Sequence, residues 1–422
     1  MTREGDTIRV FVVGASGVIG SRLVPQLSER GHDVVGTARS PGKAERLRRL
    51  GAEPVVLDAL DARAVHEAVA AAQPDAIVHQ ATALGGIGDP DFKHFDRIFA
   101  QTNRLRSEGT DNLLAAAREV GVGKFVAQSN ANHRYAREGG PVKSEDDPLD
   151  PEPPGAARES LAAMARLDRA VTGEGGIALR YGIFYGDPDD GMVEAVGARK
   201  FPIVGDGGGV WSFIHLDDAA AATVLALEHD GPAIYNVVDD EPSPTREWLP
   251  ELARIIGAKP PRRFPRLLAR LLAGEVPVVM ATESRGASNA RAKRELGWTP
   301  RYPRWRQGSP PCMGSRPPQP LRRDRFPPLP GGPGGDDAHR ELARRGRLPV
   351  RKRLRSCERP GRTRPRLSRG CPHDPGARAA RPSSLRPTAP GGSGTPFGRR
   401  LPAWVSVFSL PPRQSRARVA MT

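Results

Sequence analysis

Residues 10–20 read V-F-V-V-G-A-S-G-V-I-G. A run of apolar, mostly β-branched residues stops at Gly14, glycines follow at positions 17 and 20, and a helical pattern covers residues 18–30. A strand, a glycine turn and a helix in this order are typical of the phosphate-binding turn of dinucleotide folds, because glycine lets the backbone approach a pyrophosphate at the helix N-terminus. The sequence therefore predicts pyrophosphate contacts from Gly14, Ser16, Gly17, Val18, Ile19 and Gly20. The alternative is a tight turn that binds no ligand.

Strand and helix patterns alternate after this turn. Strands are expected at residues 34–38, 54–57, 75–79, 124–128 and 177–181, and helices at residues 43–50, 62–72, 95–120 and 156–171. This alternation predicts an α/β fold, a Rossmann-type doubly wound parallel sheet with helices on both faces. In such sheets ligands bind beyond the carboxyl ends of the strands. The residues expected at those ends, and therefore around one site, are Gly14, Arg39, Asp58, Ala81 and Ser129.

The chain divides into three predicted parts. Residues 1–185 are predicted to form the dinucleotide-binding domain. Residues 186–307 are predicted to form mainly a small substrate-binding lid, although some of their segments return to the sheet. The second part includes a strand at residues 234–237 and helices at residues 192–196, 245–256, 266–272 and 287–296. Asp217 and Asp218 are expected to cap an Ala-rich helix that runs to residue 228.

The third part, residues 308–422, differs from the rest in charge. The 422 residues carry a formal net charge of +16, but residues 1–300 hold 36 basic and 42 acidic residues, a net charge of −6. The remaining residues hold 28 basic and 6 acidic ones, a net charge of +22. Pro, Arg, Gly and Ser without periodicity predict a disordered tail. Because its basic residues are almost all Arg, as in GC-rich DNA read out of frame, we hypothesise a frameshift near Gly308.

Composition also limits the partners. The three cysteines lie in the tail, where Cys357, Cys371 and His373 lack the spacing of a zinc site, so no metal is expected. The N-terminus lacks a signal core and no stretch predicts a membrane span, which favours a cytoplasmic protein. The tail has few aromatic residues for stacking on bases, so nucleic acid is not favoured as a partner.

Arg39 follows the second predicted strand, with Lys43 nearby. An acidic residue at this place binds the ribose of NAD, whereas Arg accommodates the 2′-phosphate of NADP. The sequence therefore favours NADP(H) over NAD, with a solvated loop charge as the alternative.

Together these segments resemble the extended short-chain dehydrogenases/reductases, the NAD-dependent epimerase/dehydratase family, from about residue 8 to residue 305. The marks are G-A-S-G-V-I-G at 14–20, V-V-L-D at 55–58, I-V-H-Q-A-T at 77–82, E-G-T-D-N-L-L at 108–114, K-F-V-A-Q-S at 124–129, L-R-Y-G-I-F-Y-G at 179–186, F-I-H-L-D-D-A at 213–219 and R-E-L-G-W-T-P at 294–300. The resemblance implies that Asp58 faces the adenine, that Ala81 packs near the nicotinamide, and that Ser129 ends the strand beside that ring. It also implies a homodimer through the helices at residues 95–120 and 156–171.

The chain departs from this family at the catalytic helix. The family uses a Tyr and a Lys four residues later for proton transfer, but residues 155–164 read G-A-A-R-E-S-L-A-A-M and contain neither. Asn130 occupies the place of the companion hydroxyl residue. Tyr135, assisted by Lys143, is the candidate acid beside Ser129 and Asn130, and a packed loop aromatic is the alternative.

The expected function is an NAD(P)-dependent oxidoreductase acting on a small carbonyl or hydroxyl substrate. A non-catalytic NADP(H) sensor and a lyase or isomerase remain as alternatives. Trp211 stands where relatives that act on nucleotide sugars carry Arg, so Trp211 and Tyr185 predict contacts to a small, fairly apolar substrate. His215 and Asp217 are expected to serve the structure.

Overall fold

The computed structural model describes residues 7–84, 92–187 and 191–308. The three cysteines and the tail from residue 309 lie outside the described residues. Within the described ranges, no helix is long and apolar enough to cross a membrane.

Seven parallel strands form the central sheet, in the order β12-β7-β5-β4-β1-β2-β3. They are β1 (Arg9–Val13), β2 (Asp33–Ala38), β3 (Glu53–Val56), β4 (Ala76–His79), β5 (Lys124–Asn130), β7 (Ile177–Tyr181) and β12 (Ala233–Val237). Their sequences are mostly apolar runs rather than alternating patterns, because a parallel sheet is buried on both faces. The predicted Rossmann-type sheet is confirmed, and β12 shows that the chain returns to it after residue 185.

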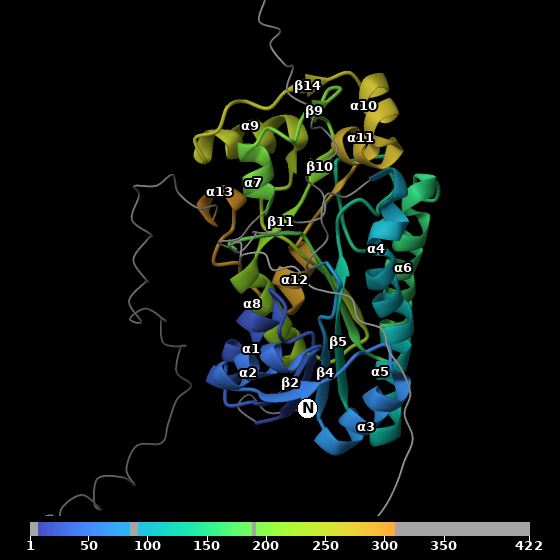
Figure 1. Ribbon diagram of the computed structural model, residues 1–422, viewed down its shortest axis with the longest axis vertical. Coiled ribbons are helices and arrows are strands. Elements are labelled where there is room, and N and C mark those ends of the chain that lie inside the picture. Colours follow the sequence, from blue (N-terminus) through green and yellow to red (C-terminus); the bar gives the residue numbers. More distant parts are fainter. Residues whose placement is uncertain (1–6, 85–91, 188–190, 309–422) are drawn as a thin grey trace, which may run out of the picture. The chain divides into compact units, whose positions relative to one another are not determined.

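Helices cover both faces of the sheet (Figure 1). Val10 and Val12 point to one face, where they pack with α1 (Gly20–Glu29), α2 (Pro41–Arg49), α8 (Leu216–Glu228) and α12 (Ala290–Glu295). Phe11 and Val13 point to the other face, toward α3 (Ala62–Ala72), α5 (Thr110–Val120) and α6 (Arg158–Gly173). This alternation within β1 follows from the two-residue period of a strand, and it places one apolar layer on each side of the sheet.

The helix predicted at residues 95–120 is interrupted. It consists of α4 (Phe95–Arg104), a π-helical turn (Leu105–Gly109) and α5. The short 3-10 turns Phe92–His94 and Gly155–Ala157 precede α4 and α6. The first helix begins at Gly20 rather than at residue 18, because residues 14–19 form the glycine turn.

The rest of the described chain forms a smaller region with an aromatic core. It contains α7 (Gly191–Gly197), α9 (Thr245–Ile255), α10 (Arg266–Ala273), α11 (Glu275–Thr282) and α13 (Trp305–Gly308). Its short strands pair as β10 (Val210–Trp211) with β13 (Ser243–Pro244), β11 (Phe213–His215) with β8 (Ile183–Tyr185), β14 (Arg263–Phe264) with β9 (Ile203–Val204), and β15 (Gly286–Ala287) with β6 (Val142–Lys143). The sequence did not predict α11. Pro277 lies in the first turn of this helix, where Pro removes no hydrogen bond.

The start of α8 corrects the predicted cap. His215 is the N-cap residue, and its Nδ1 accepts a hydrogen bond from the backbone N–H of Asp217. The Asp218 carboxylate instead accepts hydrogen bonds from the backbone N–H groups of Arg301 and Tyr302, both at 2.8 Å. Asp218 therefore fastens the end of the described chain to α8.

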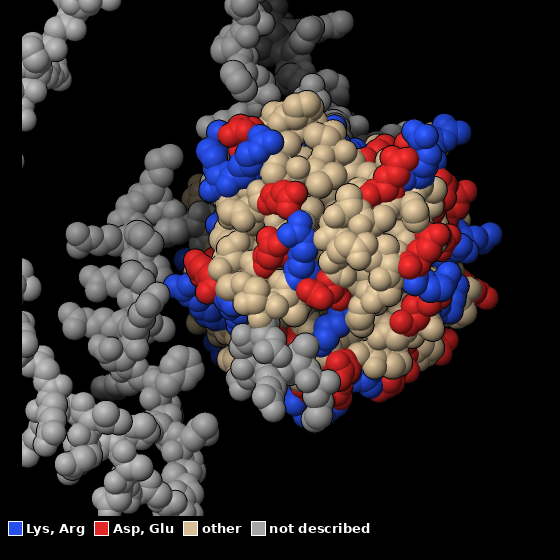
Figure 2. Space-filling view, turned by 90° about the horizontal axis from the view of Figure 1, so that it is seen from below, with Lys and Arg blue, Asp and Glu red and all other residues tan. Residues whose placement is uncertain are grey.

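Figure 2 views the molecule from below, with basic and acidic residues interspersed over this face. At the amino ends of β1, β2 and β3, Arg9 pairs with Asp33 and Glu53. The described residues on this face therefore present no broad field of one sign.

Candidate functional site

The glycine turn after β1 has a backbone that only glycine fits. Gly14 has φ +84°, and a β-carbon there would lie 2.8 Å from the Cα and N atoms of Ala81. The Gly17 N–H donates to the Gly14 carbonyl at 2.9 Å, and the Gly14 N–H donates to Oγ1 of Thr37 at 3.1 Å. The end of β1 therefore lies against the segment that follows β4, and Gly14 is in close contact with Ala81.

The turn leaves backbone donors at the start of α1. Among the described residues, the N–H groups of Ser16, Val18 and Ile19 donate no backbone hydrogen bond. The side chain of Val18 is 51% exposed, so the turn faces outward rather than into the core. A close backbone approach with unpaired N–H groups at a helix N-terminus fits a pyrophosphate.

Arg39 and Asp58 follow neighbouring strands, since Ala38 of β2 lies beside Val56 of β3. Both side chains are exposed, and within the described part of the chain Arg39 makes no ion pair. Oδ1 of Asp58 accepts a hydrogen bond from the Leu60 N–H at 3.1 Å, which holds the carboxylate at the strand end. The structure thus brings together the predicted binding residues of this edge, and their contacts to a coenzyme stay a prediction.

Side chains at and just after the end of β5 form hydrogen bonds with neighbouring segments. Ser129 is fully buried and its Oγ accepts a hydrogen bond from Nη1 of Arg134 at 3.0 Å. Oδ1 of Asn130 accepts from the N–H of Asn132 at 2.8 Å. Asn132 in turn exchanges two hydrogen bonds with the backbone of Ser212, at 3.0 and 2.8 Å. The segment after β5 therefore joins the sheet to the smaller region.

Tyr135 is 2% exposed, and both roles of its hydroxyl are used. The hydroxyl donates to Oδ1 of Asn236 at 2.7 Å and accepts from Nη1 of Arg180 at 3.1 Å. Burial raises the pKa of Tyr135, and Lys143 contacts Asp147 at 3.3 Å instead of Tyr135. This arrangement favours the packed loop aromatic over the proposed proton donor.

A buried ionic network, which the sequence did not reveal, lies behind Ser129. Oδ2 of Asp168 accepts hydrogen bonds from Nη2 of Arg134 at 2.6 Å and from Nε of Arg180 at 2.9 Å. Burial alone would raise the pKa of Asp168, but the two guanidinium groups hold it below its ordinary value. Arg106, on the π-helical turn, is buried nearby, and burial lowers its pKa to about 10. The network links β5, α6 and β7.

Trp211 and Tyr185 pack inside the smaller region. Trp211 is 1% exposed, its Nε1 donates to the Met280 carbonyl at 2.8 Å, and its ring centroid lies 5.0 Å from that of Trp248. The Tyr185 hydroxyl donates to the Tyr302 carbonyl at 3.2 Å. This packing argues against the expectation that either ring stacks on a substrate, because neither presents an open face.

His133 is a residue that the sequence analysis missed. Its φ is +59°, its Nδ1 lies 2.7 Å from Oγ of Ser284, and its ring meets that of Trp211 edge-on at 5.0 Å. Its Nε2 is buried without a hydrogen-bond partner in the described residues. Burial lowers the pKa of His133 to about 3. Its position three residues beyond Asn130, at the expected ligand edge, was the available signal.

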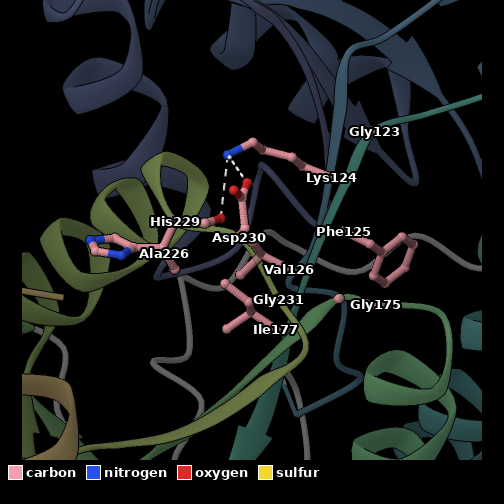
Figure 3. A pocket seen from close by; sticks show the side chains of 11 residues that line it. Gly123, Lys124, Phe125, Val126, Gly175, Ile177, Ala226, His229, Asp230 and Gly231 are labelled. Carbon is pink, nitrogen blue, oxygen red and sulfur yellow. Dashed lines mark hydrogen bonds and ion pairs between the residues drawn. The ribbon is translucent and has the colours of Figure 1, made fainter. Parts of the chain in front are cut away.

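A small cavity of about 150 Å³ lies at the opposite edge of the sheet (Figure 3). It lies at the start of β5 and β7, where Nζ of Lys124 is 3.3 Å from the His229 carbonyl and 3.4 Å from Oδ1 of Asp230. Because it lies at the amino ends of the strands, it does not belong to the candidate site.

Comparison with known proteins adds to this geometry. The model of the NAD dependent epimerase/dehydratase family matches residues 10–237. The chain is 44% identical over 310 residues to a 3-diazoavenalumate denitrifying reductase of a Streptomyces species, covering 71% of this chain and 99% of that protein.

Two further similarities are lower. Identity to a 2-alkyl-3-oxoalkanoate reductase of Stenotrophomonas maltophilia is 30% over 265 residues, covering 60% of this chain and 76% of that protein. The crystal structure of UDP-glucose 4-epimerase from Thermus thermophilus in complex with NAD superposes with a TM-score of 0.53 at 26% identity, covering 69% of this chain and 94% of that one.

Proposed function

Because the chain belongs to the NAD dependent epimerase/dehydratase family, we propose that it is an NADP(H)-dependent reductase that replaces the diazo group of an arenediazonium substrate with hydrogen. The observation that carries this proposal is the helix at residues 155–164, which lacks both the Tyr and the Lys of the family's proton-transfer pair. The relative named as a diazo-denitrifying reductase, 44% identical, supports the same chemistry.

Reduction of a carbonyl group requires a proton donor. Hydride addition to carbon leaves an alkoxide, and the alkoxide takes a proton from a positioned side chain. Here the corresponding stretch supplies buried, non-acidic side chains such as Ala157, Ser160 and Met164. The Ser160 hydroxyl is already bound, since it donates to Asp96 at 2.7 Å and accepts from Asn103 at 3.0 Å. This stretch therefore lacks the proton donor that carbonyl reduction requires.

Replacement of a diazonium group by hydride has a different balance. One C–H bond forms, the C–N bond breaks, and its electron pair leaves with N₂, so no oxyanion forms at the reacting carbon and the exchange itself takes no proton from the protein. The arene class follows from reactivity: an arenediazonium ion is an electrophile that accepts hydride, whereas the carbon of an aliphatic diazo compound is nucleophilic and accepts a proton. The missing Tyr and Lys are then no obstacle.

The residues at the candidate site fit the coenzyme. The glycine turn from Gly14 to Gly20 would hold the pyrophosphate against the free N–H groups at the start of α1. Arg39 would pair with the 2′-phosphate of NADP, and Asp58 would face the adenine. Ala81 and Ser129 would border the nicotinamide, which when bound would supply the hydride. NAD is the alternative coenzyme.

The test uses the purified full chain with NADPH and the diazonium salt of 3-amino-4-hydroxycinnamate. We expect NADPH consumption and N₂ release in a one-to-one ratio, after subtraction of the reaction without protein. With NADPH deuterated at the nicotinamide, the product is expected to carry deuterium at the carbon that lost nitrogen.

A parallel panel of 3-oxo acids and small ketones separates the alternatives. Turnover of a carbonyl substrate without turnover of the diazonium salt would contradict the proposal and support a carbonyl reductase, as the similarity to the 2-alkyl-3-oxoalkanoate reductase suggests. Tight NADPH binding without turnover of any substrate would support a non-catalytic sensor.

A further inference from the structure

His133 lies where the two regions of the molecule meet. It follows β5, at the edge of the sheet where ligands bind in doubly wound folds. Its partners come from the smaller region: Ser284 follows α11, and Trp211 belongs to β10. The adjacent Asn132 fixes the backbone through its two hydrogen bonds to Ser212. The smaller region therefore contacts both the imidazole ring and the backbone next to it.

The contacts of Ser284 bear on which nitrogen of His133 carries the proton. The Ser284 hydroxyl lies 2.7 Å from Nδ1 of His133 and 3.5 Å from the Val279 carbonyl, which is compatible with Nδ1–H donating to the hydroxyl and the hydroxyl donating to the carbonyl. Nε2 is then left as a hydrogen-bond acceptor. Burial keeps the ring neutral, because it lowers the pKa of His133 to about 3.

One feature of His133 is unfavourable for the protein alone. A buried acceptor without a donor is costly, and within the described residues Nε2 has none. The positive φ of +59° is a turn conformation in which His, like Asn and Asp, occurs more often than most residues. A bound hydroxyl group would satisfy Nε2.

We propose that His133 is a positioning residue whose Nε2 accepts a hydrogen bond from a hydroxyl group of the substrate. The inference rests on the proposed function for the aromatic class of that substrate, which makes the group a phenol. His133 thus orients the substrate and takes no part in bond making.

The test is a binding measurement that needs no turnover. The full chain, saturated with NADP⁺, is titrated calorimetrically with cinnamate and with its three monohydroxylated isomers. We expect the wild type to bind one hydroxylated isomer about tenfold more tightly than cinnamate, the effect of one good hydrogen bond. Failure of the diazonium assay would refute the proposed function and leave this result standing.

Two matched variants separate a ligand contact from a structural role. His133→Asn keeps an N–H near Ser284 and tolerates positive φ, but it lacks an acceptor at the place of Nε2, so the tenfold preference is expected to disappear. His133→Gln places an amide oxygen near Nε2 and is expected to retain part of the preference. Ser284→Ala removes the hydrogen bond between His133 and Ser284, so the tautomer of His133 is no longer fixed and the preference is expected to weaken. NADPH affinity should stay unchanged in all three.

The inference is overturned if the wild type binds no hydroxylated isomer, or binds all of them no better than cinnamate. It is also overturned if His133→Asn keeps the tenfold preference, which would leave a trapped water as the partner of Nε2.

Discussion

Gly14 and Ala81 lie so close that a β-carbon on Gly14 would stand 2.8 Å from the Cα atom of Ala81. This contact joins the turn after β1 to the segment after β4, and the φ of +84° at Gly14 adds a second restriction. Gly14→Ala is therefore expected to lower the thermal midpoint and to abolish NADPH binding, as measured by fluorescence titration. Gly42→Ala is the control, because a β-carbon at Gly42 meets nothing within 4 Å and should leave both unchanged. Wild-type NADPH affinity in Gly14→Ala would show that the turn does not hold the coenzyme.

Arg39 tests the choice of coenzyme. It is exposed and makes no ion pair in the described part of the chain, so its charge is available to a 2′-phosphate. Arg39→Asp is expected to weaken NADPH binding at least tenfold, about 1.4 kcal/mol, and to affect NADH much less. Arg49→Asp, in the last turn of α2, is the charge-matched control. Equal losses for the two coenzymes, or equal effects of the two variants, would remove Arg39 from the site.

Asp239 predicts a pH dependence of stability. Its side chain is 1% exposed, and burial raises its pKa from 3.8 to about 8, with the neighbouring carboxylates of Asp240 and Asp218 adding to the effect. A raised folded pKa means that this contribution to stability is complete below about pH 4 and is lost as the pH rises toward 8. Asp239→Asn cannot ionise, so its stability relative to the wild type should increase over that range. Urea unfolding between about pH 5 and pH 9 measures this difference; parallel curves for the two proteins would contradict it.

Replacing Asp168 by a neutral residue is predicted to cause a large loss of stability. Asp168→Asn leaves the buried guanidinium groups of Arg134 and Arg180 without their counter-ion, at an expected cost of about 3–5 kcal/mol. Because the pKa of Asp168 is lowered, this contribution is present above its ordinary pKa and is lost as the pH falls through the folded value. Glu108→Gln, in an exposed pair with Arg104, should change little. Denaturant unfolding would contradict the prediction if both variants lost similar amounts.

Tyr135→Phe separates packing from catalysis. Removal of the hydroxyl leaves Oδ1 of Asn236 and a donor of Arg180 without their partner, at an expected cost of about 1–3 kcal/mol in stability. Turnover should stay within about twofold of the wild type once the variant is folded. A variant of normal stability that has lost turnover would restore Tyr135 as the acid.

The fold could be predicted because its signals are local. Each strand of the sheet is an apolar run such as residues 10–13 or 177–181, and the ends of these runs place Gly14, Arg39, Asp58 and Ala81 along one edge. The two-face burial of a parallel sheet makes such runs stand out from the amphipathic helices between them.

The details of the candidate site depend on partners that are remote in sequence. His133 and Ser284 are 151 positions apart, and Tyr135 and Asn236 are 101 positions apart. No local pattern marks such pairs, so the sequence left Tyr135 open between acid and packed aromatic and gave His133 no role. The predicted contact of Trp211 with a substrate has the same origin, because the position of Trp211 in the chain does not reveal the ring of Trp248 beside it.

The position of β12 in the sheet has a consequence for synthesis of the protein. β12 covers the outer edge of β7, and α8, which precedes it, covers apolar residues such as Val126 and Leu179. A ribosome that has released β7 but not residues 216–237 therefore holds a nascent chain with a bare strand edge and an uncovered apolar layer, both of which promote aggregation. Chaperone capture of nascent chains should consequently be strongest while these residues are still inside the ribosome, and premature stops between residues 185 and 233 should yield chains that are degraded rather than stable shortened proteins.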